Sequence, residues 1–252
     1  MRQAVLLTCE GELGRIAANY LAPHFPGLLT IVDGPQSRWR LLKGRTKRLG
    51  PAAAAGQVAF MAFQRLQRRY SSGRIEAIKR EFRFDDGPPQ VDVKRVDDVN
   101  GEACRMLLRE QKPGVVLVMG TRLIAQATLL AAEAPFVNYH AGITPKYRGV
   151  HGAYWPRATR DAANCGVTVH VVDAGIDTGA ILYQERISPG PDDNFSTYPY
   201  LQLAAGLPLL ARAGKDALQG DLAPLTVDLP SKLWSHPTLW GYFAAGFGRG
   251  VW

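Results

Sequence analysis

Short apolar runs that read as β-strands alternate along this chain with segments that read as helices. The clearest run, Val115–Met119 (VVLVM), is apolar at every position, follows Pro113-Gly114 and ends before Gly120. A strand without alternating polar residues is expected in the middle of a parallel sheet, where helices cover both faces. The alternation therefore predicts a doubly wound, mostly parallel α/β sheet. The expected strands are Gln3–Thr8, Leu28–Val32, Val91–Val96, Val115–Met119, Phe136–Tyr139, Val167–Val172 and Ile181–Ile187.

Glycine and proline mark the limits of the expected helices. The turn Cys9–Gly14 leads into a helix over Arg15–Leu21, and its glycines could bring helix N–H groups near a phosphate. Two glycines without the third are a weak fingerprint, so a plain tight turn is the simpler interpretation. After the last strand, Pro199 and Pro208 limit the start and middle of a further helix. The other expected helices are Asp98–Glu110, Leu123–Ala132 and Leu201–Leu218.

Residues 36–83 form a strongly basic segment between the second and third expected strands. They contain thirteen Lys and Arg but only two acids, Glu76 and Glu81, so the local balance is +11 in a chain of net charge +8. The segment reads as a basic helical insertion. A solvated helical face is the simpler interpretation; a polyanionic partner, an acidic membrane surface and a phosphorylated substrate stay open.

The size and composition suit one large α/β domain, with or without a modest appendage, and point away from a membrane-spanning chain. No apolar run approaches the roughly 20 residues that cross a bilayer. The apolar stretch before Glu10 and Glu12 is too short for a signal peptide. Cys9, Cys104 and Cys165 form neither a metal-type spacing nor a disulfide framework. We therefore expect a cytoplasmic protein that uses no metal.

Polar residues stand at the ends of two late strands. Asn138 and His140 are two residues apart, so on a regular strand they point to the same side. An amide N–H and an imidazolium there can both stabilise an oxygen that becomes negative. Asp177, in a glycine-flanked loop, can relay a proton or keep His140 charged near neutral pH. His170 is expected to be a satisfied core histidine, and each motif alone is equally compatible with a structural polar pair.

Three motifs occur together in a fixed order. They are Asn138-Tyr-His140-Ala-Gly-Ile-Thr-Pro145-Lys-Tyr147-Arg148-Gly149, Gly166-Val-Thr168-Val-His170 and Asp177-Thr-Gly179-Ala-Ile181. In order, spacing and residue type the chain resembles, over about residues 113–187, the catalytic core of the 10-formyltetrahydrofolate-dependent formyltransferases. The resemblance implies a Rossmann-like fold and a formyl transfer from 10-formyltetrahydrofolate to an amine. No Ser or Cys nucleophile is positioned, which suits attack by an external amine.

The resemblance also implies site residues and domain limits. Asn138, His140 and Asp177 would be catalytic. Residues 1–220 would form the catalytic domain, and the aromatic, Gly-rich residues 221–252 a tail that packs on it or buries itself in a homodimer. The folate would be held by the loop after Val115–Met119 and by backbone near the Asp177 loop: Met119, Gly120, Thr121, Arg122, Leu123, Ile124, Val172 and Asp173.

One stretch departs from the family pattern. The family usually has Ser-Leu-Leu-Pro where this chain has Gly142-Ile143-Thr144-Pro145, and Gly142 is expected to loosen the loop on the acceptor side. A small biosynthetic amine such as a nucleotide-linked amino sugar is the leading acceptor. Methionyl-tRNA is disfavoured, because that branch carries a further C-terminal barrel and too few residues follow 187, but it stays open because the basic segment could contact RNA phosphates. Glycinamide ribonucleotide is disfavoured because Gly11 and Gly14 fit its N-terminal pattern poorly.

Two other classes of function stay open. A formyltetrahydrofolate hydrolase uses a similar core, normally after an N-terminal regulatory domain, whereas here the first strand begins at Gln3. A non-catalytic binding protein could keep the fold and use the basic segment as an anionic docking surface. Such a role would not require Asn138, His140 and Asp177 together.

Overall fold

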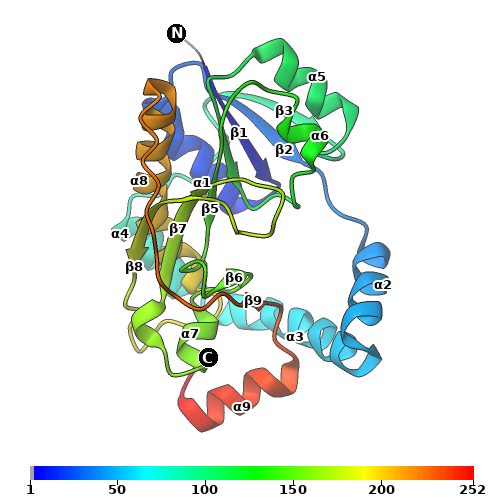
Figure 1. Ribbon diagram of the computed structural model, residues 1–252. Helices are drawn as coiled ribbons and strands as arrows, with labels where there is room; N and C mark the ends of the chain where they lie inside the picture. Colours follow the sequence, from blue (N-terminus) through cyan, green and yellow to red (C-terminus); the bar gives the residue numbers. More distant parts are fainter. Residues whose placement is uncertain (1–2) are drawn as a thin grey trace.

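A seven-stranded sheet forms the centre of the protein. The computed structural model describes residues 3–252, and the side chains of these residues except 38–42 and 48. The strand order is β3-β2-β1-β4-β5-β7-β8, and β7 alone runs antiparallel to both its neighbours (Figure 1). The predicted α/β fold with a mostly parallel sheet is therefore confirmed. The strands are β1 (Ala4–Cys9), β2 (Leu29–Asp33), β3 (Asp92–Val96), β4 (Val115–Met119), β5 (Phe136–His140), β7 (Gly166–Val171) and β8 (Ile181–Arg186).

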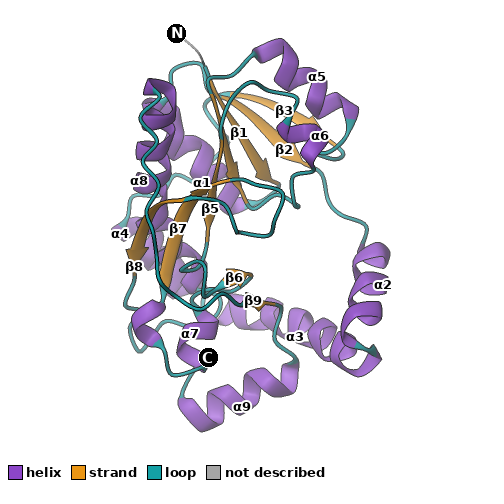
Figure 2. Ribbon diagram, in the orientation of Figure 1, coloured by secondary structure: helices purple, strands orange, loops and turns teal. Residues whose placement is uncertain are grey.

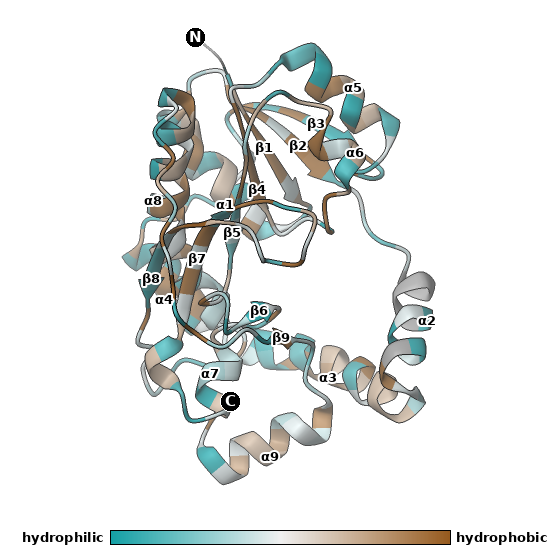
Figure 3. Ribbon diagram, viewed as in Figure 1, coloured by the Kyte–Doolittle hydropathy of each residue, from teal (hydrophilic) through white to brown (hydrophobic). Residues whose placement is uncertain are grey.

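Helices cover both faces of this sheet, which explains the apolar strands. Leu6 and Leu117 pack into one hydrophobic cluster, and Val5 and Val116 into a second on the opposite face. All five residues of β4 are buried. Figure 3 shows the central strands mainly in brown, the colour of hydrophobic residues. The first face is covered by α1 (Glu12–Leu21), α4 (Ser72–Glu81) and α8 (Tyr198–Gln219), and the second by α5 (Glu102–Gln111) and α6 (Gln126–Leu129).

The basic segment and the C-terminal segment pack on each other below this sheet. The segment 36–83 is helical as predicted, comprising α2 (Arg38–Leu49), α3 (Pro51–Tyr70) and α4 (Figures 1 and 2). The C-terminal segment contains β9 (Leu233–Trp234) and α9 (Leu239–Arg249). Phe60 of α3 is fully buried, with its ring centroid 5.0 Å from that of Tyr242 in α9. A third hydrophobic cluster thus joins two segments far apart in the sequence.

A short parallel pair of strands fastens the C-terminal segment beside the carboxyl end of β5. The strand β6 (Arg148–Gly149) pairs with β9. Gly149 has a φ of +95°, and a Cβ there would lie 2.3 Å from the Trp234 carbonyl oxygen. The pairing therefore requires glycine. The remaining short elements are α7 (Tyr154–Ala158), η1 (Ala22–His24) and η2 (Ala162–Asn164).

Two helices differ from the sequence prediction. The helix expected over Leu123–Ala132 shrinks to α6, because the Asn100 side chain bonds Leu123 O (2.8 Å) and Ala125 N (2.7 Å), which holds this stretch as a loop. The helix α8 continues through Pro208 without a break. Pro208 lies on the exposed face of α8, while the buried face packs on the sheet. Among the described residues, no helix is long and apolar enough to cross a membrane.

Candidate active site

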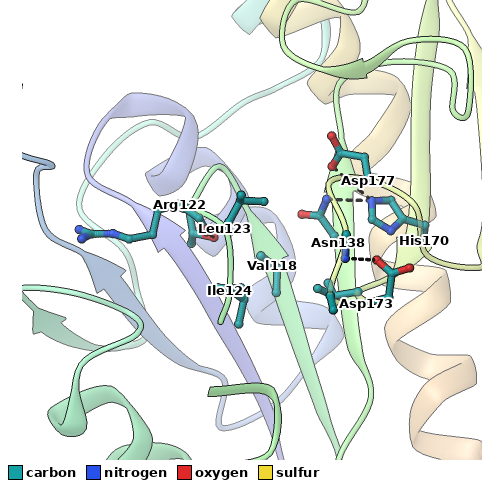
Figure 4. Close-up of a pocket in the computed structure, with 12 residues that line it drawn as sticks. Val118, Arg122, Leu123, Ile124, Asn138, His170, Asp173 and Asp177 are labelled. Atoms are coloured by element: carbon teal, nitrogen blue, oxygen red, sulfur yellow. Dashed lines mark hydrogen bonds and ion pairs between the residues drawn. The ribbon is translucent and has the colours of Figure 1, made fainter. Parts of the chain in front are cut away.

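A narrow cavity opens at the carboxyl ends of β4 and β5, where ligands bind in open α/β sheets. We call it the strand-end cavity. Its volume is about 100 Å³, and polar groups meet an apolar wall there (Figure 4). It is lined by Val118, Thr121, Arg122, Leu123, Ile124, Asn138, His170, Val172, Asp173, Ala174, Gly175 and Asp177.

Four polar side chains form a chain of contacts at this cavity. Asn138 lies 3.0 Å from His170 Nε2, and that nitrogen lies 3.6 Å from Asp177 Oδ1. The other carboxylate oxygen, Asp177 Oδ2, lies 3.4 Å from His140 Nδ1. The sequence-predicted residues Asn138, His140 and Asp177 are therefore brought together, with His170 between the first and the third. Asn138 and Asp177 line the cavity, whereas His140 lies behind Asp177 and is only 6% exposed.

His170 was expected from the sequence to be a core histidine with no part in the site. It is 2% exposed and its Nδ1 lies 2.8 Å from Val171 O, as expected of a satisfied core histidine. Its Nε2, however, faces Asn138 and Asp177 in the cavity wall (Figure 4). The antiparallel pairing of Asn138 with His170 across β5 and β7 places the two side by side. The motif order contained this signal, because His170 stands in the second motif, but a single histidine in an apolar strand does not reveal its neighbours.

The Asn138 amide can face the cavity in two ways. In one orientation its Nδ2 lies 3.0 Å from His170 Nε2. In the other, assigned from the hydrogen-bond network, Oδ1 accepts from His170 Nε2, and Nδ2 donates to Val118 O (3.1 Å) and Tyr139 O (3.2 Å). In the first orientation Oδ1 would face only the carbonyl oxygens of Val118 and Tyr139, so the hydrogen-bond network favours the second, which satisfies both N–H groups within the protein.

His140 is neutral rather than charged. Burial lowers the pKa of His140 from its ordinary value, and the nearby Asp177 carboxylate opposes this shift without reversing it. The expectation of a persistent imidazolium is therefore wrong, because desolvation outweighs the one opposite charge. Its Nε2 lies 2.7 Å from Tyr147 O, and its Nδ1 faces Asp177 Oδ2. Since both neighbours are acceptors, a neutral ring can donate to only one, and a protonated ring would donate to both.

Asp177 is held ionised between the two histidines. Burial by itself would raise its pKa, but the contacts with His170, His140 and the Gly149 N–H together lower it. Gly149 N donates to Asp177 Oδ2 at 2.8 Å. Asp177 adopts a left-handed backbone with φ of +50°, a conformation that Asp tolerates better than most residues. The carboxylate can therefore accept a proton within reach of His140.

The segments expected to hold folate line the cavity only in part. Thr121, Arg122, Leu123 and Ile124 line it, as do Val172 and Asp173. Met119 and Gly120 do not appear in the lining. Met119 belongs to β4 and packs, 4% exposed, into the hydrophobic core of the sheet.

The Arg122 guanidinium forms ion pairs that hold the loop after β4 in place. Its guanidinium pairs with Asp33 (2.8 Å) and Asp98 (2.8 Å) and points away from Asn138 in Figure 4. These contacts raise the pKa of Arg122, led by the hydrogen bond to Asp33. Arg122 thereby fixes the loop that follows β4 against the end of β2.

Gly142 tightens its loop, contrary to the expectation from sequence. Added to Gly142, a Cβ would lie 2.5 Å from Tyr147 O and 2.8 Å from His140 Nε2. Gly152 crosses the same place, since its N donates to Ala141 O at 2.9 Å. The departure from the family pattern is therefore matched by close packing around His140.

Comparison with known proteins places this geometry in one family. Residues 77–200 match the family model described as Formyl transferase. Methionyl-tRNA formyltransferase of Koribacter versatilis (strain Ellin345) is 33% identical over 127 residues, which cover 50% of this chain and 38% of that protein. The chain thus spans less than half the length of this curated relative.

Two solved structures share the fold. A 4-N formyltransferase from Francisella tularensis is similar with a TM-score of 0.58 at 13% identity, over 96% of this chain and 78% of that one. The N-formyltransferase from Helicobacter canadensis in complex with folinic acid and dTDP-3-aminofucose has a TM-score of 0.57 at 15% identity, over 93% of this chain and 71% of that one. At such identities the likeness concerns the fold alone.

Proposed function

Because the chain belongs to the formyl transferase family, we propose that it moves a formyl group from 10-formyltetrahydrofolate to the amine of a small biosynthetic acceptor. One observation carries this proposal. Asn138, His170 and Asp177 converge on one cavity at the end of β5, with His140 in contact behind Asp177. An amide, an ionised carboxylate and a neutral imidazole are the groups needed to polarise an acyl oxygen and take a proton from an amine.

The strand-end cavity offers the apolar and polar groups that one edge of a folate ring would contact. The side chains of Val118, Leu123 and Ile124 supply apolar walls, and the loop at Asp173 supplies polar groups. Bound 10-formyltetrahydrofolate would supply the formyl carbon. A volume of about 100 Å³ is below the range of about 300–1,000 Å³ typical of ligand pockets. A cavity of this size therefore suits part of the folate, such as one edge of its ring, rather than the whole molecule.

The protein's groups divide the work of the transfer. The acceptor nitrogen bonds to the formyl carbon while the bond from that carbon to the folate nitrogen breaks. Asn138 Nδ2, which bonds the Val118 and Tyr139 carbonyls in the favoured orientation, would turn to donate to the formyl oxygen. Asp177 accepts the proton that the amine loses, and His140 stabilises the protonated pair, because a charged His140 donates to both its neighbours. The pair then passes this one proton to the folate nitrogen as its bond to the formyl carbon breaks, so the exchange balances.

A nucleotide-linked amino sugar is the acceptor class that we favour. The Helicobacter canadensis protein, whose fold this chain shares, was solved with dTDP-3-aminofucose. Methionyl-tRNA is a second candidate, because the curated relatives carry that name. We place the reaction in the cytoplasm, which agrees with three described cysteines that are all free.

A direct assay tests the activity. Purified protein with 10-formyltetrahydrofolate should release tetrahydrofolate only when a suitable amine is added, with dTDP-linked amino sugars as the first panel. Release in water alone would identify a hydrolase. The His140→Ala variant should bind folinic acid normally and lose turnover. If no amine, including charged methionyl-tRNA, supports release and the wild type fails to bind folinic acid, the proposal is overturned.

A further inference from the structure

A second and larger cavity lies on the other side of the Asp177 loop. We call it the insertion cavity; its volume is about 590 Å³. Only Gly149, Val150 and Ile176 of its lining fall inside residues 77–200, the part that matches the family model. The rest comes from α2 and α3, which contribute Arg45 and Gln57 among others, and from residues 233–236 of the C-terminal segment. Most of the cavity lining therefore lies outside the segment that matches the family model.

The two cavities meet at Asp177. Its carboxylate lines the strand-end cavity, and Asp177 Oδ2 accepts from the N–H of Gly149, which lines the insertion cavity. Ile176, the residue before Asp177, lines the insertion cavity too. Arg148 Nη1 donates to Ile176 O at 3.0 Å and fixes this part of the loop. Two neighbours of the Asp177 carboxylate, Gly149 and Ile176, therefore line the insertion cavity, while the carboxylate itself lines the strand-end cavity.

Specific contacts hold the walls of the insertion cavity together. Gln57 Nε2 donates to His236 O at 2.6 Å, and so joins α3 to the C-terminal segment. His151 Nε2 and His236 Nδ1 lie 2.9 Å apart. Trp155 Nε1 donates to Ser235 O at 3.0 Å. Polar bonds between buried groups of distant segments indicate a preformed cavity rather than a gap between loose elements.

The charge of this cavity is positive. Arg45 is the cationic side chain of the lining, and no described lining residue is acidic. Arg45 Nη1 donates to Met61 Sδ at 2.9 Å, which places its guanidinium beside α3. No acid occurs anywhere between Asp33 and Glu76 in the sequence. The positive potential reaches the histidines, because burial and then the charge of Arg45 lower the pKa of His236 to about 4.

We propose that the insertion cavity binds the formyl acceptor, and that this acceptor carries a phosphate or diphosphate which Arg45 recognises while its amine points to Asp177. The inference rests on the proposed function. A volume of about 590 Å³ lies within the range typical of small-molecule sites, and the described wall offers cationic but not anionic recognition. The basic insertion and the C-terminal segment then have one joint role, which is to enclose the anionic end of the acceptor.

Two probes separate this inference from the proposed function. Isothermal titration calorimetry with thymidine diphosphate reports the insertion cavity, and titration with folinic acid reports the strand-end cavity. We expect thymidine diphosphate to bind the wild type. The substitution Arg45→Glu should weaken it at least about tenfold, and Arg109→Ala, an exposed arginine of α5 paired with Glu102, should change it less than twofold. Folinic acid should bind all three proteins equally.

A second variant keeps the test decisive if Arg45→Glu does not fold. Gly44 lines the cavity and has no atom within 4 Å of an added Cβ, so Gly44→Trp fills the space and keeps the charge. It should also abolish thymidine diphosphate binding and leave folinic acid binding intact. Unchanged thymidine diphosphate affinity in the folded variants overturns the inference. The inference is also overturned if the variants bind methionyl-tRNA more weakly than the wild type but keep their affinity for thymidine diphosphate. Failure of folinic acid to bind the wild type speaks against the proposed function instead.

Discussion

The strand-end cavity and the insertion cavity differ in where along the chain their walls originate. The first is built between Val118 and Asp177, within the segment that matches the family model. The second joins the helices of the insertion to the C-terminal segment, and its wall is closed by a bond between residues 57 and 236. Chemistry that depends on neighbouring strand ends leaves a motif in the sequence. A cavity assembled from remote segments leaves no motif, and only the basic and aromatic composition of those segments marks it in the sequence.

The largest effect that separates the two regions is expected from Asn138→Ala. Loss of the amide removes the donor to the formyl oxygen, so kcat should fall about 10²–10³-fold. The acceptor KM should stay within about threefold, because Asn138 does not line the insertion cavity. Steady-state kinetics checks both values. Asn19→Ala is the matched control, since that side chain bonds only the loop at Asp85–Gly87 and Gln90 and should leave kcat unchanged. A rise in KM alone would place Asn138 in acceptor binding.

What could be predicted from sequence follows the same division. The strand β4 was predicted to the residue, because a strand buried on both faces has to be apolar at every position. Asn138 and Asp177 were identified by their place at strand ends, and they do line the strand-end cavity. The charge of His140 was predicted wrongly, because the degree of burial, which decides it, is a property of the packed molecule.

The remaining differences come from contacts that the local sequence pattern does not show. Arg122 was predicted to lie at the folate pocket and does line the strand-end cavity, but its guanidinium is held by Asp33, 89 residues away. Gly142 was expected to loosen its loop, but Gly152 packs against it. Neither Asp33 nor Gly152 could be recognised as a partner from local pattern, since the first contact depends on the sheet order and the second on how the loop after β5 folds back on itself.

The second-largest effect is expected from acid, which should lower the free energy of unfolding through two buried histidines near the insertion cavity. His236 has a pKa of about 4, and that of His151 lies well below its ordinary value, mainly because both are buried. Below pH 6.5 the unfolded chain therefore binds protons that the folded chain does not, so stability is full above pH 6.5 and falls as the pH drops toward 4. His236 alone should account for about 2 kcal/mol between pH 7 and pH 5.

Urea unfolding of the wild type and His236→Gln at pH 7 and pH 5 measures this contribution. In the variant, the difference in the free energy of unfolding between pH 7 and pH 5 should be about 2 kcal/mol smaller than in the wild type. His24→Gln removes a partly exposed histidine that does not line the insertion cavity and should change the difference far less. An unaltered pH dependence in His236→Gln would show that this histidine is protonated in the folded protein.

Gly142→Ser introduces the residue that the family usually has and should still damage the strand-end region. The new Cβ lies too close to the Tyr147 carbonyl and to His140 Nε2, so overpacking should cost about 1–3 kcal/mol and lower kcat. Thermal unfolding and kinetics check this. Gly73→Ser, where an added Cβ meets no atom within 4 Å, should have little effect. Full activity and stability in Gly142→Ser would mean that the loop yields easily and that the close packing around His140 is unimportant.

The smallest effect tests whether the two cavities are independent. Thr238 caps α9, because its Oγ1 accepts a hydrogen bond from Gly241 N at 3.2 Å. Thr238→Ala should lower the stability by about 1 kcal/mol, which corresponds to a fall in Tm of about 2–4 °C for a chain of this size. Thr238→Ser keeps the oxygen and should restore most of the loss. Since α9 supports the insertion cavity through its contact with α3, thymidine diphosphate should bind slightly more weakly to Thr238→Ala, whereas folinic acid affinity should not change. If folinic acid weakens in parallel with the diphosphate, the loop at Asp177 couples the two cavities energetically, and the family core and the added segments then act as one binding unit.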